Sequence, residues 1–210
     1  MKVLITAGPT REPIDSVRFI TNASSGKMGV ALAEEAIARG HEVAVIAGPI
    51  DVDTSKKIKR INVRTAREMT AAVLDELKNG YDVFISAAAI ADYTPVKTTK
   101  GKLDSDKDII IKLKKTRKLI KLVKKQFPDV FVVGFKAEFG GGKGLIEKAY
   151  ERLTENRIDL IVANDIEKNR FGSGRTEVWV VDREKNIRYI PENAKKKIAA
   201  KLWKIIETAT

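Results

Sequence analysis

Short apolar runs alternate along this chain with longer segments whose apolar residues recur at helical spacing. The first run, residues 2–7, is almost continuously apolar, which is typical of a strand buried on both faces of a sheet. We expect further strands at residues 42–47, 58–63, 82–88, 130–135 and 158–163. Helices are expected at residues 25–39, 66–77, 116–126 and 143–155. A hairpin within residues 177–190 and a closing helix at 192–208 complete the pattern.

This progression of βαβ units predicts an α/β fold that is Rossmann-like, with a doubly wound, mainly parallel sheet and a small β-hairpin. At 210 residues, the chain suits a single domain over residues 1–210. Two polar segments, about 93–112 and about 165–175, do not fit the alternation and follow predicted strand ends. Because the carboxyl ends of the strands border the ligand crevice in such sheets, we expect both segments to be flaps over the site.

Residues 21–29 run directly into the first predicted helix and are the strongest candidate for an anion site. Ser24 or Ser25 is expected to cap the helix, and Gly26 and Gly29 allow a ligand or another backbone to approach its first turn. Lys27 adds a full positive charge to the partial positive charge of the helix N-terminus.

The same stretch fails the two common nucleotide-binding motifs. A P-loop needs a glycine where Thr21 stands and a hydroxyl where Met28 stands. A dinucleotide fingerprint should follow the first strand at once and place an acid after the second, but the strand at 42–47 ends in Gly48 and Pro49. The stretch is therefore an anion site of another kind.

Composition excludes several kinds of chemistry. The chain has no cysteine, which rules out disulfides, thiolate metal sites and a cysteine nucleophile. Its single histidine, His41, follows a predicted helix end, where we interpret it as a connector rather than a catalytic base. No run approaches a membrane span and no leader is recognisable, so we expect a cytoplasmic protein that does not bind a membrane.

The formal net charge of +12 favours an anionic partner, either nucleic acid or a polyphosphate or acidic metabolite. The densest basic run, residues 112–118, continues into 119–125 and is interpreted as the solvated face of an amphipathic helix. Because no aromatic residues are interleaved with it, binding of single-stranded nucleic acid is disfavoured. Abundant Lys and Glu also fit a thermostable protein.

Five polar segments at or near predicted strand ends together resemble one family, phosphopantothenate–cysteine ligase (phosphopantothenoylcysteine synthetase) of coenzyme A biosynthesis. They keep the order and spacing of the family's motifs over nearly the whole chain. The segments read TAGPTREPID at 6–15, RFITN followed by SSGKMG at 18–29, AAIADY at 88–93, VGFKAE at 133–138 and AND at 163–165.

The resemblance implies a reaction in two steps. A nucleoside triphosphate, CTP or ATP, activates the carboxylate of 4′-phosphopantothenate as an acyl-nucleotidylate and releases pyrophosphate. The amine of L-cysteine then attacks, giving 4′-phosphopantothenoyl-L-cysteine and the nucleoside monophosphate. The resemblance also implies Mg²⁺ as cofactor, a homodimer, and a flavin-dependent decarboxylase as the partner activity. Nucleotidyl transfer depends on positioning and charge stabilisation, which suits a chain with so little histidine and cysteine.

The resemblance further implies roles for individual residues, carried over position by position. Residues implied in catalysis are Asn22, which holds the carboxylate, Arg18, Lys102 and Ala89. Residues implied in phosphopantothenate binding are Asn22, Ser24, Gly26, Lys27 and Gly29. Residues implied in nucleotide binding are Ser86, Asp92, Lys102, Phe135, Arg152 and Asn156. No residue is implied as a metal ligand.

The chain departs from the family pattern at two places. The flap motif Lys-x-Lys-Lys is reduced to Lys102, because Asp104 and Ser105 replace its other lysines. Two nucleotide-binding lysines correspond to Arg152 and Asn156, and only Arg152 keeps the charge, which leaves CTP and ATP both open. The alternative hypotheses are an NAD(P)-dependent Rossmann oxidoreductase and a basic nucleic-acid-binding module.

Overall fold

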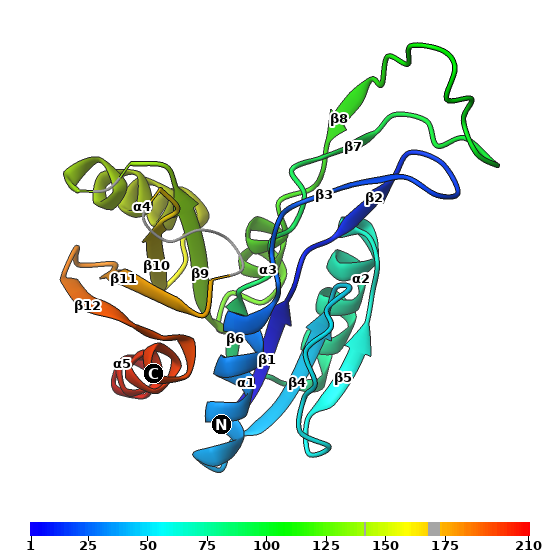
Figure 1. Cartoon of the computed structure of the whole chain (residues 1–210). Coiled ribbons are helices and arrows are strands. Elements are labelled where there is room, and N and C mark those ends of the chain that lie inside the picture. The colour runs from blue at the N-terminus through cyan, green and yellow to red at the C-terminus, as the bar shows by residue number, and fades with distance from the viewer. Residues whose placement is uncertain (141, 168–172) are drawn as a thin grey trace.

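An eight-stranded sheet forms the centre of the computed structural model, which describes residues 1–140, 142–167 and 173–210 (Figure 1). Its order is β12-β11-β10-β9-β6-β1-β4-β5. The strands are β1 (Lys2–Ala7), β4 (Glu42–Ala47), β5 (Lys59–Asn62), β6 (Val83–Ser86), β9 (Phe131–Glu138), β10 (Leu160–Asp165), β11 (Arg175–Asp182) and β12 (Ile187–Ala194). The six strands from β10 to β5 pair in parallel, whereas β11 and β12 pair antiparallel. The predicted α/β fold is thereby confirmed.

The strand order of the sheet reverses its direction between β1 and β6, which are neighbours in the sheet and form its switch point. From β1 it proceeds outward to β4 and β5, then returns to β6 and proceeds the other way to β9 and β10. Strands that diverge from such a switch point leave a crevice at their carboxyl ends, because the connecting helices leave toward opposite faces. The topology therefore places the crevice beside the ends of β1 and β6.

Helices cover both faces of the sheet. They are α1 (Lys27–Ala38), α2 (Ala66–Glu76), α3 (Leu119–Gln126), α4 (Lys143–Asn156) and α5 (Lys195–Ala209), with a short 3₁₀ turn at Leu77–Asn79 after α2. Leu32 of α1 and Trp203 of α5 belong to one apolar core, and the Trp203 indole donates a 2.8 Å hydrogen bond to the Leu32 carbonyl. Met69, Val123 and Leu153 of α2, α3 and α4 belong to the core on the other face.

Two pairs of short strands extend away from the sheet as one arm (Figure 1). The arm consists of residues 11–21, with β2 (Arg11–Pro13) and β3 (Phe19–Thr21), and residues 93–115, with β7 (Tyr93–Pro95) and β8 (Leu113–Lys115). The Thr99 amide donates to the Ile14 carbonyl at 3.0 Å, and the Ser16 amide donates to the Gly101 carbonyl at 3.1 Å. These bonds join segments that lie about eighty residues apart in sequence.

The arm bears on two expectations. The 93–112 segment was expected to be a flap over the site, whereas it begins with β7, is followed by β8 and extends away from the sheet within the arm (Figure 1). The expected helix at 116–126 begins only at Leu119, so the basic run up to residue 118 is not a helix face. The reason lies at Thr116, whose amide donates to the Asp92 carbonyl at 2.9 Å and whose hydroxyl donates to the Ala91 carbonyl at 2.7 Å.

Two further boundaries differ from expectation or lie partly outside the described residues. The closing helix begins at Lys195 rather than at residue 192, because residues 192–194 extend β12. Of the second expected flap, at 165–175, residues 168–172 lie outside the part of the chain that the structure describes. Across the described ranges, no helix has the length and apolar character that a membrane crossing would need.

Candidate functional site

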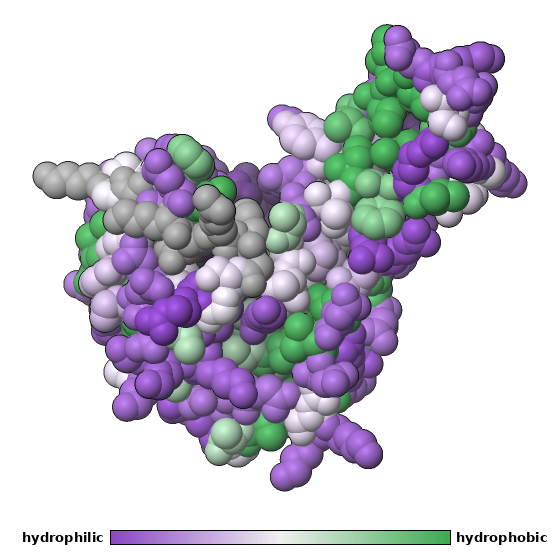
Figure 2. Space-filling view, in the orientation of Figure 1, coloured by the Kyte–Doolittle hydropathy of each residue, from purple (hydrophilic) through white to green (hydrophobic). Residues whose placement is uncertain are grey.

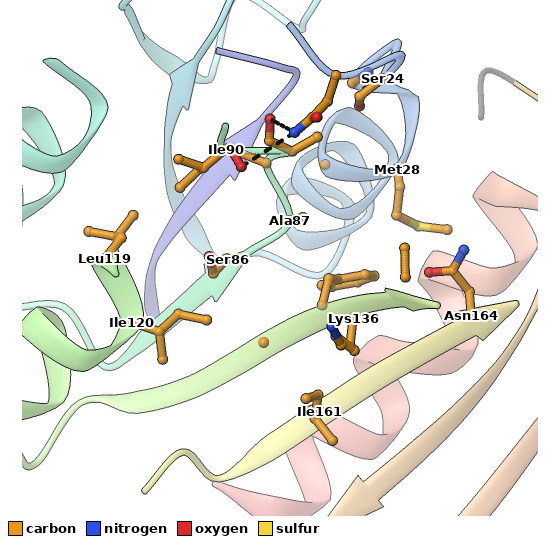
Figure 3. A pocket seen from close by; sticks show the side chains of 18 of the residues that line it. Ser24, Met28, Ser86, Ala87, Ile90, Leu119, Ile120, Lys136, Ile161 and Asn164 are labelled. Atoms are coloured by element: carbon orange, nitrogen blue, oxygen red, sulfur yellow. Dashed lines mark hydrogen bonds between the residues drawn. The ribbon is translucent and has the colours of Figure 1, made fainter. Parts of the chain in front are cut away.

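A pocket of about 420 Å³ opens at the carboxyl ends of the central strands, beside the switch point (Figure 3). In this view, Ser86 ends β6 and Ala87 follows it, Lys136 lies on β9, and Ile161 and Asn164 lie on β10. Met28 marks the start of α1 on the far side from Leu119 and Ile120 of α3. Ten of the residues singled out from the sequence line this pocket: Asn22, Ser24, Gly26, Lys27, Gly29, Ser86, Ala89, Asp92, Phe135 and Arg152.

Asn22 connects the loop before α1 to the backbone that follows β6. Its side-chain nitrogen donates to the Ala89 carbonyl at 3.1 Å and to the Ile90 carbonyl at 3.3 Å. Because carbonyl oxygens only accept hydrogen bonds, the nitrogen rather than the oxygen of the Asn22 amide must face them. In this arrangement the amide nitrogen already donates to two backbone carbonyls, so a donated bond to a substrate carboxylate requires one of these contacts to be released.

The start of α1 corrects the expectation that Ser24 or Ser25 caps the helix. The N-cap residue is Gly26, in the left-handed region with φ 73°, and no side chain caps the helix. The Ser24 hydroxyl instead accepts a 3.3 Å hydrogen bond from the Gly26 amide. The left-handed conformation favours glycine, and it turns the chain before a side chain could reach the second or third helical amide.

Close packing explains both glycines of this stretch. A Cβ atom on Gly26 would lie 2.5 Å from Cγ2 of Ile50. A Cβ on Gly29 would lie 2.7 Å from the Ala7 Cβ and 3.0 Å from the Thr6 carbonyl oxygen. The close approach that these glycines allow is therefore that of α1 to β1 and its neighbours.

Charged side chains on the pocket lining form ion pairs with each other or with side chains beside the pocket. The Asp92 carboxylate forms an ion pair with the Lys118 ammonium group. The Lys136 ammonium lies 2.5 Å from the Glu138 carboxylate, and Lys148 lies 3.2 Å from it. The Lys136 hydrogen bond is the first of the contacts that hold the pKa of Glu138 below its ordinary value, so this carboxylate is charged. Of these groups, Asp92, Lys118 and Lys136 line the pocket, so charges of both signs border it.

Asn156 lies outside the pocket, contrary to the role that the resemblance implied. Its side chain is buried at the end of α4, with 3% of the residue exposed, and its amide nitrogen donates to the Arg152 carbonyl at 2.5 Å. Arg152, one helical turn earlier, does line the pocket. A shift of four residues on a helix keeps roughly the same face, but burial at the helix end turns Asn156 to the protein interior.

Arg18 and Lys102 are also absent from the pocket lining, because both lie on the arm. The arm brings them together at one point: the Arg18 guanidinium donates to the Leu103 carbonyl at 3.2 Å, directly beside Lys102. The two cations that the resemblance implies for catalysis are therefore neighbours of each other, but neither borders the pocket that contains Asn22.

Asp15, which ends the quoted 6–15 segment but was given no role from the sequence, holds this junction together. Its side chain is fully buried, and it accepts hydrogen bonds from the Arg18 amide at 2.6 Å and the Val17 amide at 2.7 Å. It also accepts from the Leu103 amide at 3.0 Å and forms a 3.1 Å ion pair with the Arg18 guanidinium. The amide bonds from Arg18 and Leu103 are the main causes that lower the pKa of Asp15 to about 2.

Several lining residues were given no role from the sequence, among them Thr116, Asn164, Thr176 and Lys195. Asn164 lies within the quoted AND motif, but the other three carried no local signal, because each belongs to a polar or basic run typical of a surface. The described residues contain no cluster of three or more His, Cys, Asp or Glu side chains that could hold a metal ion. Among the described lining residues, Asp92 is the one carboxylate.

Known proteins resemble this chain along its whole length. Residues 1–209 match the family described as DNA/pantothenate metabolism flavoprotein C-terminal domain. The coenzyme A biosynthesis bifunctional protein CoaBC of Thermococcus kodakarensis is 43% identical over 208 residues, which is 98% of this chain and 51% of that protein. The chain thus spans about half the length of this relative.

Solved structures agree with the sequence comparison. The C-terminal domain of a coenzyme A biosynthesis bifunctional protein CoaBC superposes with a TM-score of 0.83 at 34% identity, covering 99% of this chain and 94% of that one. The DNA/pantothenate metabolism flavoprotein from Streptococcus pneumoniae gives a TM-score of 0.88 at 27% identity, with both chains covered completely. The chain therefore belongs to the family of the DNA/pantothenate metabolism flavoprotein C-terminal domain.

Proposed function

We propose that this chain is a phosphopantothenate–cysteine ligase. The observation that carries the proposal is the pocket at the switch point, which gathers ten implied site residues from segments spread between residues 22 and 152. Its relatives are named for coenzyme A biosynthesis and are longer than this chain. Membership of their family supports the same pathway step for this domain.

The reaction joins two molecules through an activated acid. A carboxylate oxygen of 4′-phosphopantothenate attacks the α-phosphorus of CTP or ATP, and the bond to the β-phosphate oxygen breaks to release pyrophosphate. The cysteine amine then attacks the acyl carbon, loses a proton and expels the nucleoside monophosphate. Both steps move negative charge through the site, so fixed cations and amide donors are the groups that lower their barriers.

Asn22 and Ala89 are proposed to hold the reacting carboxylate. Asn22 is proposed to give up one of its hydrogen bonds to the Ala89 and Ile90 carbonyls and to donate a hydrogen bond to the carboxylate instead. Its side-chain oxygen is then proposed to face the space into which the amine enters. Ala89 keeps the wall small where the acyl group lies. Ser24 and Lys27 are proposed to contact phosphopantothenate, and Gly26 and Gly29 to keep α1 close to β1.

Ser86, Asp92, Phe135 and Arg152 are proposed to bind the nucleotide. Phe135 offers a ring for the base, and Asp92, an exposed carboxylate, can accept from a ribose hydroxyl. We assign no such contact to Asn156, which is buried away from the pocket. CTP and ATP both fit these groups, since none of them reads the base edge on its own.

Mg²⁺ is proposed to enter with the triphosphate. The described residues contain no cluster that would hold the ion alone, and this fits a metal that is commonly bound through substrate phosphates and one carboxylate. Asp92 is the lining carboxylate placed to contribute. The ion supplies neutralisation of phosphate charge, and the chain's own lysines and arginines supply the remainder.

The arm is proposed to make the homodimer. Large apolar side chains lie exposed on it, and Figure 2 shows them as the apolar region at the end of the molecule. These are Val17, Tyr93, Val96, Ile109, Ile110, Ile111 and Leu113, of which Ile110 is 92% exposed. Such a patch on an extended element is typical of an interface, and a second copy is the occupant whose arm presents the same surface. A flavin-dependent decarboxylase is proposed to consume the product.

The direct test is release of pyrophosphate by the purified protein given phosphopantothenate, cysteine, Mg²⁺ and either CTP or ATP. We expect release with phosphopantothenate present, and formation of the amide product only when cysteine is added. Comparison of kcat/KM for the two nucleotides decides the base preference. If neither nucleotide gives pyrophosphate above the level without phosphopantothenate, the ligase proposal is wrong.

A further inference from the structure

Two lysines that begin different helices lie at the same end of the pocket. Lys27 is the first residue of α1 and Lys195 the first residue of α5. Both line the pocket, and both line a second hollow on its outer side, so they form the wall between the two. The packing of α1 against α5, fixed by the Trp203 bond to the Leu32 carbonyl, holds this pair in place.

The positive charges of this pair are not neutralised within the described residues. Neither ammonium group has a hydrogen bond or an ion pair with any described residue. The second hollow also has three lining carboxylates, those of Glu34, Glu35 and Asp53. On the pocket side, the one described lining carboxylate is that of Asp92, which pairs with Lys118, so the face that the two lysines turn to the pocket is positively charged.

Holding two ammonium groups close together in a partly buried wall is unfavourable for the empty protein. Burial, and then the charge of Lys27, lower the pKa of Lys195, so no neighbouring carboxylate outweighs these effects. An anion with two charges placed between the two groups would remove this repulsion and form charge-assisted hydrogen bonds to both. The two lysines and their mutual repulsion therefore favour an anion that carries two negative charges.

We propose that Lys195 and Lys27 together bind the phosphate monoester of the acid substrate. This inference rests on the proposed function and adds to it a residue, Lys195, near the C-terminus of the chain. Met28, the residue after Lys27, lies across the pocket from Leu119 and Ile120 in Figure 3. The groups proposed for the nucleotide, Asp92 and its partner Lys118, lie beside α3. The carboxylate is assigned to Asn22, which contacts the backbone of Ala89 and Ile90.

The nucleotide triphosphate has the same chemistry and is the competing source of a phosphate here. The test therefore measures both substrates for the wild type, Lys195→Met and Lys27→Met, in the dimer as it exists. Lys197→Met is the matched control, because Lys197 is exposed on the same turn of α5 and lines neither hollow. Methionine keeps much of the lysine length, and removal of an unpaired charge leaves the fold intact, which thermal unfolding verifies.

We expect Lys195→Met to raise the KM for phosphopantothenate by about tenfold to a hundredfold, with the KM for nucleotide within about twofold of the wild type. Lys195→Arg should recover part of the loss, and Lys197→Met should behave as the wild type. Unphosphorylated pantothenate should bind weakly and equally to the wild type and Lys195→Met.

Calorimetric binding of phosphopantothenate, without nucleotide, separates this inference from the ligase proposal. If the wild type and Lys195→Met bind phosphopantothenate equally, the assignment of Lys195 is overturned while the ligase proposal stands. A rise confined to the KM for nucleotide overturns the assignment to the phosphate monoester and places the triphosphate at the pair. Failure of the wild type to bind phosphopantothenate overturns both.

Discussion

Asn22 is held by an arrangement that an aspartate could not reproduce. Its nitrogen donates to two carbonyl oxygens, and a carboxylate oxygen in that place would be repelled by both and by the substrate carboxylate. We expect Asn22→Asp to lower the rate of pyrophosphate release by roughly a hundredfold or more. Nucleotide affinity, measured by calorimetry, should stay near that of the wild type. Turnover equal to the wild type would show that Asn22 does not hold the carboxylate.

Asp15 is expected to determine whether the two halves of the arm stay together. In Asp15→Asn the new amide group faces the N–H donors of Arg18 and Leu103, so at least one bond is lost. Trypsin should then cleave at the arm lysines several times faster. Asp104→Asn is the control, since Asp104 is exposed on the same arm and contacts only Asp106 and Lys107. Equal cleavage of both variants would contradict the role of Asp15.

The lowered pKa of Asp15 predicts how the stability of the arm depends on pH. A carboxylate whose folded-state pKa is lowered to about 2, from 3.8, stabilises the fold fully above the higher value. That stabilisation is lost as the pH falls toward 2. Trypsin does not act at such a pH, so hydrogen exchange of the Leu103 amide is the suitable measurement. Protection should be constant from pH 7 to about 4.5 and should then fall, whereas Asp15→Asn should show no such step.

At the scale of elements, two glycines near the starts of helices should respond oppositely to the same change. Alanine at Gly29 would press on Ala7 and on the Thr6 carbonyl of β1, whereas a Cβ at Gly144 of α4 meets nothing within 4 Å. We expect Gly29→Ala to lower the free energy of unfolding by about 1 to 3 kcal/mol. Gly144→Ala should raise it by up to about 1 kcal/mol through helix propensity. Urea unfolding measures both, and equal effects would refute the packing role of Gly29.

The main elements follow from patterns within single segments, and these the sequence predicts well. The runs at 2–7 and 42–47 match β1 and β4, and the helix expected at 66–77 matches α2, where Thr65 and Glu68 form a capping box. The strands of the arm were missed because each is three residues long, too short for a recognisable alternation of apolar and polar residues. Its pairing depends on bonds such as that of Asp15 to Leu103, whose partners are 88 residues apart.

The candidate site shows the same limit. Asn22 and Asp92 were placed in the site by the family resemblance, and both line the pocket at the carboxyl ends of the strands, where the predicted sheet topology puts a ligand crevice. Lys195 was not placed there, since its basic run is indistinguishable from a solvated helix face until α5 is packed against α1. The predicted cap at Ser24 or Ser25 was wrong because Gly26, in the left-handed conformation, is the N-cap residue. Its conformation fits the close packing of Ile50 and Gly8, which lie far from it in the sequence.

At the scale of the whole molecule, the arm should decide the oligomeric state. Ile110→Glu places a charge at the most exposed apolar position of the arm, and burial of an unpaired charge in an interface is strongly unfavourable. We expect light scattering to show a dimer for the wild type and a monomer for this variant. Ile187→Glu, at an exposed apolar position on β12, should leave the dimer intact. A dimeric Ile110→Glu would exclude this part of the arm from the interface.

The backbone of the arm continues without interruption into the pocket. β3 ends at Thr21, and the next residue is Asn22, whose amide is bonded to the far wall. A displacement of the arm is therefore passed through one peptide unit to the group proposed to hold the carboxylate. Any partner that favours one orientation of the arm must change the affinity of the pocket for its ligand. By thermodynamic reciprocity, a bound substrate must then change the affinity of the arm for that partner by the same factor.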